Sequence, residues 1–375
     1  MRFLHTSDWQ LGMTRAFLGE EAVARFAQAR IGAITTLGKH AADNGAGFII
    51  VAGDVFESNQ VSRVVLARTI DALEALPVPV FLLPGNHDPL DGASIFATKE
   101  FESTSEHVIV IRDMTPIPVP GLQGVEVVGA PWRSKRPGSD LCRELAESLQ
   151  PAQGVMRIAV AHGQVTSLAP DTSRAEVIDE GALDAALAAG KFHYVGLGDR
   201  HSVHPVGSSG RSWYSGAPVA TAFDETDPNK ALLVDLADNE CCVSPLDVGN
   251  WHFIAAQRAL DGPGDLAEFS DWLDSLPDKE CTAVKVGLEG SINLATAGAL
   301  DELLAEHAPR FASLRIRERT TRLAVLPDAL DQDSVALAGY ARAAWNELLE
   351  QANDGDGEAS DALRLLYRLS RAGGA

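Results

Sequence analysis

The sequence predicts an α/β protein: a sandwich of two sheets with helices on its outer faces, then a small α+β domain and C-terminal helices. Three observations predict this fold class. From residue 1 to about 250, short apolar strands alternate with helices, which favours a largely parallel sheet. After about residue 107 the expected strands are closer together and separated by turns, which indicates a second sheet packed against the first. Beyond about residue 250 the pattern becomes α+β, and after Pro327 it becomes helical.

Three short strands are expected to begin the first sheet, over residues 2–7, 48–52 and 80–84. Each is apolar and rich in β-branched or aromatic residues, as buried central strands are. Helices over about residues 21–43 and 62–76 separate them, and this β-α-β-α-β order implies parallel pairing. Later strands are expected over residues 107–111, 126–129, 157–161, 192–198 and 231–235.

The region after the sandwich has the order β-α-β-α-β, over residues 251–256, 264–276, 282–288, 294–307 and 313–318. The chain therefore divides into a domain of residues 1–250, an α+β capping domain of residues 251–325 and a C-terminal helical segment of residues 330–375.

Two helices are expected in that last segment, over about residues 333–351 and 358–371. Each carries an apolar stripe at helical spacing, formed by Leu337, Tyr340, Ala341, Ala344, Trp345, Leu348 and Leu349 in the first and by Ala362, Leu365, Leu366 and Leu369 in the second. Such stripes either pack on the parent domain or bind a partner.

The bulk composition is that of a globular protein, with 46% hydrophobic and 22% charged residues. A run of about 18 apolar residues is absent, so we expect no membrane span. The chain begins directly with a strand, without the features of a signal peptide. Cys142, Cys241, Cys242 and Cys281 form no CxxC pair, and the adjacent pair would be strained as a disulfide. A cytoplasmic location is therefore expected.

The net charge of −21 argues against broad, non-specific binding to nucleic acid, because phosphate contacts are made by Lys and Arg. A metal centre would nevertheless supply local positive charge. Basic clusters occur at Arg133-Ser-Lys135-Arg136 and at Arg315, Arg317, Arg319 and Arg322. Solvated surface ion pairing is the alternative interpretation of both clusters.

Polar side chains follow five of the expected strands: Asp8 and Gln10, then Asp54, then Asn86, His87 and Asp88, then His162, and finally Asp199 and His201. Open α/β sheets place their ligand sites at the carboxyl ends of strands. Each string alone has an ordinary alternative, such as a Gly-Asp turn, a strand-end histidine or an Asx turn. Burying all five unpaired would be costly. Hard oxygen and nitrogen ligands together predict a two-metal hydrolytic centre.

The residue types suggest individual roles. If strand geometry continues, Asp8 and Gln10 point to one side, towards a shared metal, and Asp199 and His201 repeat this spacing. Asp54 is placed to bridge two ions. For His87 we expect a role as general acid or protonated electrostatic partner. Two further expectations are that Asn86 offers a carbonyl oxygen and that Asp88 orients the ring of His87.

The strings follow the order D-x-[H or Q], GD, GNHD, H-G and G-x-x-H, which resembles the calcineurin-like metallophosphoesterase superfamily. HTSDWQLG, VAGDVFES and LPGNHDP are more closely similar to the SbcD family, nuclease subunits that work with an SbcC-type coiled-coil ATPase. The similarity covers roughly residues 1–220. It implies that His87 acts on the scissile phosphodiester and that two metals are held, one by Asp8, Gln10, Asp54 and His201 and the other by Asp54, Asn86, His162 and Asp199.

Two residues depart from the family pattern. Gln10 stands where the family usually has His, and Asp199 stands where it usually has the first His of Gly-His-x-His. The resulting ligand set is rich in oxygen and favours Mn²⁺ or Mg²⁺ over Zn²⁺. His204 is an alternative source of the missing imidazole, although its spacing from His201 makes it the weaker candidate.

The resemblance implies a Mn²⁺-dependent DNA exonuclease or phosphodiesterase of DNA repair or recombination. The expected substrate contacts are Arg200, Arg133 and Lys135, and the partners are DNA, a second copy of the chain and an SbcC-like ATPase. That ATPase would dock on the C-terminal helices, with its acidic positions paired to Arg364, Arg368 and Arg371. Two alternatives stay open: a phosphoesterase for cyclic nucleotides or phosphomonoesters, which the net charge favours, and a weakened enzyme that mainly binds DNA ends or the ATPase.

Overall fold

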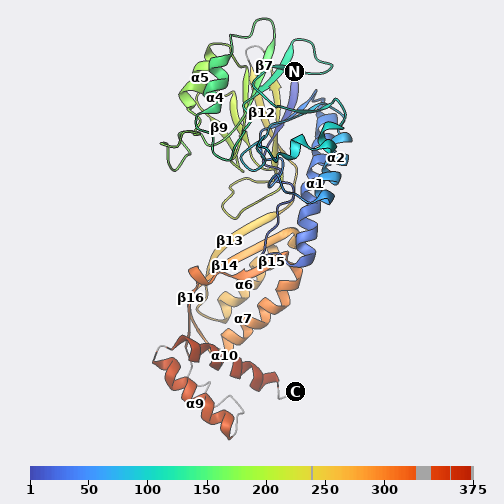
Figure 1. The fold of residues 1–375 in the computed structure, drawn as a ribbon. Coiled ribbons are helices and arrows are strands. Elements are labelled where there is room, and N and C mark those ends of the chain that lie inside the picture. Colours follow the sequence, from blue (N-terminus) through green and yellow to red (C-terminus); the bar gives the residue numbers. More distant parts are fainter. Residues whose placement is uncertain (238–239, 327–338, 355, 373–375) are drawn as a thin grey trace. The chain divides into compact units, whose positions relative to one another are not determined.

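The computed structural model describes residues 1–237, 240–326, 339–354 and 356–372 (Figure 1). Contacts divide the chain into two compact units. Unit 1 comprises Met1–Ala16 and Val23–Trp251, and unit 2 comprises Phe17–Ala22 and His252–Ala375. Among the described residues, no helix combines the length and the apolar character that crossing a membrane requires.

Unit 1 contains two six-stranded sheets, which confirms the predicted two-sheet α/β fold. The first has the order β12-β11-β1-β2-β3-β4, and its strands are β1 (Arg2–Thr6), β2 (Ile49–Val51), β3 (Val80–Leu82), β4 (Val108–Val110), β11 (Lys230–Leu236) and β12 (Cys241–Asp247). The second has the order β5-β6-β7-β8-β10-β9, and its strands are β5 (Ile117–Pro118), β6 (Val125–Gly129), β7 (Met156–His162), β8 (Tyr194–Gly198), β9 (Val203–Val206) and β10 (Ser212–Ser215). The strands β1 to β4 are parallel, as are β6, β7, β8 and β10.

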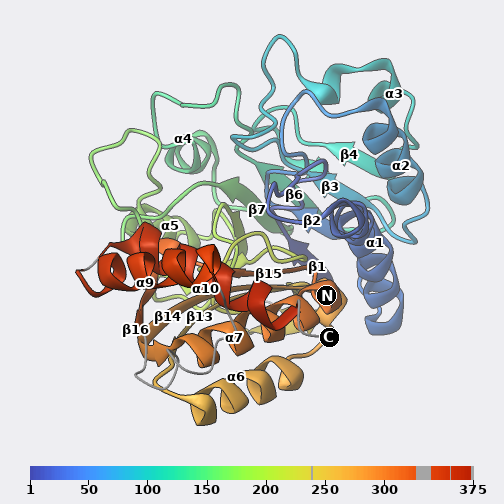
Figure 2. The same cartoon turned by 90° about the horizontal axis from the view of Figure 1, so that it is seen from below.

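Helices cover the outer face of each sheet. The helices α1 (Glu20–Asn44) and α2 (Arg63–Glu74) lie beside the first sheet, and α4 (Leu141–Ser148) and α5 (Glu180–Ala188) lie beside the second (Figure 2). A short helix, α3 (Lys99–Glu102), follows β3. Side-chain caps begin several of these helices: the Ser62 hydroxyl accepts from the amide of Val65, and Asp140 and Asp179 cap α4 and α5.

The central strands are buried on both faces, which explains their continuous apolar sequences. In β2, Ile49 and Val51 pack towards α1 and α2, whereas Ile50 joins the core between the two sheets. Alternate strand residues point to opposite faces, so both faces must be apolar. The core between the sheets also contains Phe48 and Tyr194.

Unit 2 contains a four-stranded parallel sheet of β13 (His252–Ala259), β14 (Thr282–Asn293), β15 (Ser313–Ile316) and β16 (Arg322–Leu326). The helices α6 (Pro263–Ser275) and α7 (Leu294–His307) supply Phe269 and Leu300 to its core. The strand β16 pairs with the second half of β14 and extends the predicted β-α-β-α-β order by one strand.

Two C-terminal helices follow, α9 (Tyr340–Asn353) and α10 (Gly357–Ala372). Leu337 and the rest of residues 333–338, predicted to begin the first helix, lie outside the described residues. Part of each predicted stripe packs within unit 2: Trp345 and Leu349 are buried in a cluster with Leu294 of α7, and Leu366 packs against it. Leu363, which is not in the predicted stripe, is also buried in this cluster. By contrast, Leu365 and Leu369 of α10 are 53% and 60% exposed. The side chains of Arg364, Arg368 and Arg371 also lie outside the described part.

Candidate metal centre

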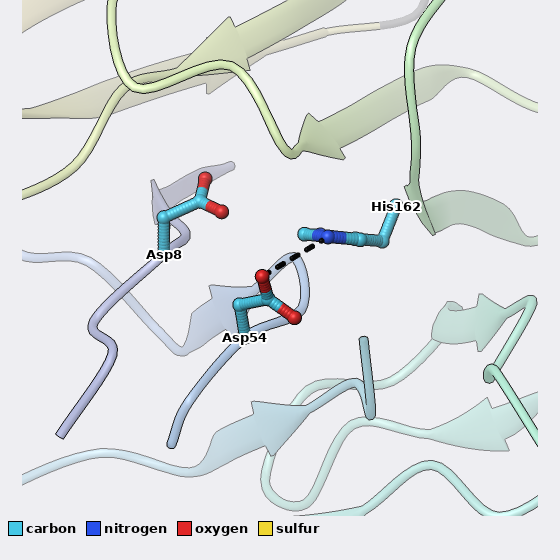
Figure 3. A group of neighbouring side chains, drawn as sticks. All are labelled: Asp8, Asp54 and His162. Carbon is cyan, nitrogen blue, oxygen red and sulfur yellow. Dashed lines mark ion pairs between the residues drawn. The ribbon is translucent and has the colours of Figure 1, made fainter. Parts of the chain in front are cut away.

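Side chains from both sheets of unit 1 converge beyond the carboxyl ends of the strands. Parallel pairing places Thr6 opposite Val51 and His162 opposite Gly198, so the segments that follow these strands begin side by side. Asp8, Asp54 and His162 are buried, and each offers a ligand atom within 4.8 Å of the other two (Figure 3).

Asp54 lies in the middle of this cluster. Its Oδ2 is 3.5 Å from Nε2 of His162 and 3.9 Å from Nε2 of His87, while its Oδ1 accepts from the amide of His87 at 2.9 Å. A Cβ on Gly85 would lie 2.2 Å from Oδ1 of Asp54. Glycine at position 85 therefore permits the close approach of the GNHD loop to the central carboxylate.

His201 and Gln10 lie on the Asp8 side of the cluster. Nε2 of His201 is 3.6 Å from Oδ1 of Asp8 and 3.4 Å from Nε2 of Gln10. His204, the alternative imidazole, lies in the edge strand β9.

His162 and Asn86 lie on the other side. Nε2 of His162 is 2.7 Å from Oδ1 of Asn86 and 3.8 Å from Oδ1 of Asp199. Nδ1 of His162 is 2.8 Å from the main-chain oxygen of Ala52, which can only accept, so Nδ1 carries a proton. This hydrogen bond turns Nε2 towards the cluster.

The route by which several of these residues reach the cluster differs from the predicted one. The strand β1 ends at Thr6, and both Asp8 and Gln10 have left-handed backbones with φ of 54° and 43°. Asp54 and Asp199 are also left-handed, with φ of 52° and 96°. The expectation of continued strand geometry with i, i+2 spacing is therefore wrong. These conformations cost free energy in non-glycine residues and concentrate at functional sites.

The electrostatics of the two imidazoles indicate a negative potential in the cluster. Burial acts to lower the pKa of His162, but Asp54 outweighs it and holds the pKa well above the usual value. Burial acts in the same direction on His201, yet Glu225 and Asp8 raise its pKa above the ordinary value. Excess negative charge in a buried cluster is compensated by protons or by metal cations.

The ring of His87 is oriented by a main-chain group. Nδ1 of His87 is 2.9 Å from the carbonyl oxygen of Glu57, which leaves Nε2 facing Asp54. The carboxylate of Asp88 instead accepts hydrogen bonds from the backbone amides of Gly85 and Phe56. The prediction that Asp88 orients His87 is corrected accordingly, because both Asp88 oxygens brace the loops. Burial raises the pKa of Asp88 to about 7.

Two pockets border the cluster, and Gln164 and Asp199 line both. One, of about 220 Å³, is also lined by Arg200, whose Nε is buried without a hydrogen-bond partner among the described residues. The other, of about 200 Å³, is lined by the exposed Lys135. Arg133 is exposed, lies outside both pockets and donates to a main-chain oxygen.

Sequence reasoning did not identify the residues that hydrogen-bond to His201 and Asp8 and so hold these two side chains in place. Thr221 and Glu225 both contact Nδ1 of His201, and the Ser7 hydroxyl donates to Oδ2 of Asp8 at 2.6 Å. Ser7 lies within the string HTSDWQLG, directly before Asp8, whereas Thr221 and Glu225 lie in a loop without a recognisable pattern.

The residues present fit a pair of divalent ions. Carboxylate, amide and imidazole groups converge, and Asp54 is central enough to serve two ions. In addition, Oε1 of Gln10 and Oδ2 of Asp199 are buried with no hydrogen-bond partner in the described part of the chain. Buried polar atoms of this kind are costly unless another group binds them. An oxygen-rich donor set suits Mg²⁺ or Mn²⁺.

The family model described as calcineurin-like phosphoesterase matches residues 1–236. The chain is 26% identical over 314 residues to the SbcD subunit of the nuclease SbcCD of Escherichia coli K12, with 74% of each chain covered. It is 26% identical over 269 residues to the DNA double-strand break repair protein Mre11 of Methanosarcina mazei, covering 70% of this chain and 40% of that protein.

Solved structures match at lower similarity. TT1561 of Thermus thermophilus matches with a TM-score of 0.39 and 14% identity, covering 65% of this chain and 97% of that one. The purple acid phosphatase PPD1 of yellow lupin matches with a TM-score of 0.36 and 12% identity, covering 66% and 51%.

Proposed function

The chain belongs to the calcineurin-like phosphoesterase family, and on this premise we propose that it is a Mn²⁺-dependent DNA exonuclease that works with an SbcC-like ATPase in DNA repair or recombination. The observation that carries the proposal is the convergence of ligand atoms from both sheets around Asp54. The similarity to the SbcD subunit of the nuclease SbcCD, which spans 74% of both chains, supports a phosphodiester in DNA as the substrate.

In this proposal Asp8, Gln10, Asp54 and His201 hold one ion, and Asp54, Asn86, His162 and Asp199 hold the other. Two divalent ions supply Lewis-acid stabilisation to the phosphoryl oxygens and to the attacking water. Mn²⁺ is favoured over Mg²⁺ because the set still contains two imidazoles beside its oxygen donors.

His87 acts on the substrate in this proposal, because Nε2 is oriented towards the cluster while Nδ1 is engaged by a carbonyl oxygen. Its side chain is 36% exposed, so a bound phosphodiester can reach it. A protonated Nε2 can donate to a phosphate oxygen or to the leaving alcohol, which is general acid catalysis. Arg200 and Lys135 are the proposed phosphate contacts, since each lines a pocket beside the cluster. Arg133 is not assigned a role.

The domain roles follow from the same proposal. Residues 1–250 carry the nuclease activity, residues 251–325 are the capping domain and residues 330–375 bind the ATPase. The exposed Leu365 and Leu369, one helical turn apart on α10, support an apolar contact with a coiled coil. All four cysteines are thiols and not disulfides, which supports a reducing cytoplasm as the location.

A second function is favoured by a specific observation. The pocket beside Arg200 also contains the carboxylates of Asp224 and Glu225, and the whole chain has a net charge of −21. Both features disfavour a long polyanion and suit a small phosphate ester. A phosphoesterase for cyclic nucleotides or phosphomonoesters is therefore the alternative.

One experiment separates the two functions. The full chain with Mn²⁺ is assayed on bis-p-nitrophenyl phosphate, on cyclic nucleotides and on linear duplex DNA labelled at one end. Hydrolysis of the diester and progressive degradation of the DNA support the nuclease. Turnover of cyclic nucleotides with the DNA left intact supports the alternative, and binding of DNA without any turnover indicates a weakened enzyme.

A further inference from the structure

The loop after β10 forms a hydrogen-bond network behind His201. Nδ1 of His201 is 2.6 Å from Oγ1 of Thr221 and 3.1 Å from Oε1 of Glu225. The Glu225 carboxylate also accepts from the amides of Thr221 and Ala222 and from the Thr221 hydroxyl. The Glu225 side chain is 6% exposed, so these contacts are shielded from water.

The network defines the tautomer of His201. The Thr221 hydroxyl has one proton, and it donates that proton to Oε1 of Glu225. Towards His201 the same hydroxyl can therefore only accept, as can the ionised carboxylate. Nδ1 of His201 must then carry the proton, and Nε2 presents its lone pair to Asp8 and Gln10.

Two arginines hold this loop against the first motif. Nε and Nη2 of Arg15 donate to the carbonyl oxygen of Thr221 at 2.9 and 2.7 Å. The buried Arg30 of α1 donates to the carbonyl oxygen of Trp9 at 2.7 Å and to that of Ala220 at 3.2 Å. Arg30 thus hydrogen-bonds both to the loop behind His201 and to the segment that carries Asp8 and Gln10.

We infer that Glu225 is a positioning residue. It contacts His201 both directly and through Thr221, and these contacts make His201 a stronger and correctly oriented metal ligand. The inference rests on the proposed metal centre and extends it to a residue that does not touch the metal. Its importance is greater here because Gln10 replaces an imidazole, which leaves His201 as the imidazole on the Asp8 side. An anionic partner on Nδ1 increases the basicity of Nε2, and the loss of such a partner typically weakens metal affinity about 10- to 100-fold.

The test is calorimetric titration of the full chain with Mn²⁺ after removal of bound metal. Glu225→Gln is expected to weaken binding of one of two ions by about 10- to 100-fold. Asp224→Asn is the matched control, because it removes a neighbouring, exposed carboxylate of the same pocket, and it is expected to bind as wild type. Thr221→Val is expected to weaken binding in the same direction, and Thr221→Ser, which restores the hydroxyl, to recover it.

Nitrogen-15 NMR of the metal-free histidines, recorded at a pH at which His201 is neutral, provides a second readout. The Nδ1–H tautomer of His201 is expected in wild type and Thr221→Ser, and a changed tautomer in Glu225→Gln. Wild-type Mn²⁺ affinity in Glu225→Gln, or an equal loss in Asp224→Asn, would overturn the inference. If Glu225→Gln does not fold, the comparison of Thr221→Val with Thr221→Ser decides. A different result would contradict the proposed function, namely that the wild-type protein itself binds no divalent ion.

Discussion

Nε2 of His162 lies 2.7 Å from Oδ1 of Asn86, although His162 ends a strand of the second sheet and Asn86 follows a strand of the first. Carboxylate oxygens of Asp54 and Asp199 lie 3.5 and 3.8 Å from the same nitrogen. Nδ1 is already engaged by the carbonyl oxygen of Ala52. A neutral imidazole has a single N–H, so oxygen acceptors at both nitrogens require either a second proton or a cation at Nε2. The raised pKa of His162 reflects the same contacts, and a cation at Nε2 would take the place of the second proton.

The first prediction concerns the central carboxylate. Asp54→Asn is expected to abolish hydrolysis, because a neutral amide bridges two cations poorly. Its loss of metal affinity is expected to exceed the roughly 10- to 100-fold loss that follows when a residue that only hydrogen-bonds to a metal ligand is removed. Elemental analysis and a bis-p-nitrophenyl phosphate assay measure both effects. Asp224→Asn is the control, and normal turnover in folded Asp54→Asn protein would contradict the two-metal centre.

The second prediction separates chemistry from ligation at His87. His87→Asn and His87→Ala are expected to retain both metals and to lose roughly 10²-fold or more in turnover rate, the usual scale for a positioned acid–base group. The metal content of the purified variants is measured beside the rate. Loss of metal in either variant would show that His87 is a ligand.

The third prediction concerns the two departures from the family pattern. Gln10→His combined with Asp199→His is expected to shift metal preference from Mn²⁺ or Mg²⁺ towards Zn²⁺, because imidazole replaces oxygen donors. Competition titrations with these ions measure the shift, and each single variant serves as a control. A double variant with wild-type selectivity would mean that the two residues are not both ligands.

The fourth prediction tests the close contact between the sheets. A Cβ on Gly198 would lie 1.8 Å from the main-chain oxygen of Ala52 and 2.8 Å from Cβ of Ser7. Gly198→Ala is therefore expected to destabilise the protein by at least about 1–3 kcal/mol, since neither neighbour can yield without backbone movement. Thermal unfolding measures this change.

Gly32→Ala is the matched control for that substitution. It lies within α1, and apart from the backbone of that helix no atom of the described residues comes within 4 Å of the added Cβ, so the substitution should be neutral or stabilising by up to about 1 kcal/mol. Equal stability of the two alanine variants would show that the sheets separate more easily than the structure implies.

The fifth prediction concerns ATPase binding. Leu365→Asp with Leu369→Asp is expected to abolish association with an SbcC-like ATPase while leaving diester hydrolysis and thermal stability unchanged, because both side chains are exposed. Co-purification measures the association. Leu363→Asp is the contrasting variant, since Leu363 is buried and its charge should destabilise unit 2. Retained association in the double variant would place the ATPase surface elsewhere.

Truncation after about Pro327 is a less specific test of the same surface. It would remove Trp345, Leu349 and Leu363 from their cluster with Leu294 and expose that residue of α7. The substitutions on α10 avoid this loss of packing.

The sequence predicted the two-sheet fold and named side chains that the structure brings together, because both depend on local pattern. Strands such as β2 are buried on two faces and must be apolar throughout. Parallel strands in register bring their carboxyl ends together, so the residues after them gather at one edge. The apolar strands and the polar residues that follow them are each properties of short segments, so they can be recognised without knowledge of distant contacts.

Only the tertiary structure decided how the side chains approach one another. The left-handed backbones of Asp8, Gln10 and Asp54, which replace the expected strand geometry, are held by hydrogen bonds such as that from the amide of Asp8 to the oxygen of Gly53. Glu225, which follows His201 by 24 positions in the chain, lies within hydrogen-bond distance of Nδ1 of His201. Contacts of this kind depend on how loops close around a completed core, and loop closure leaves little periodic trace in the sequence.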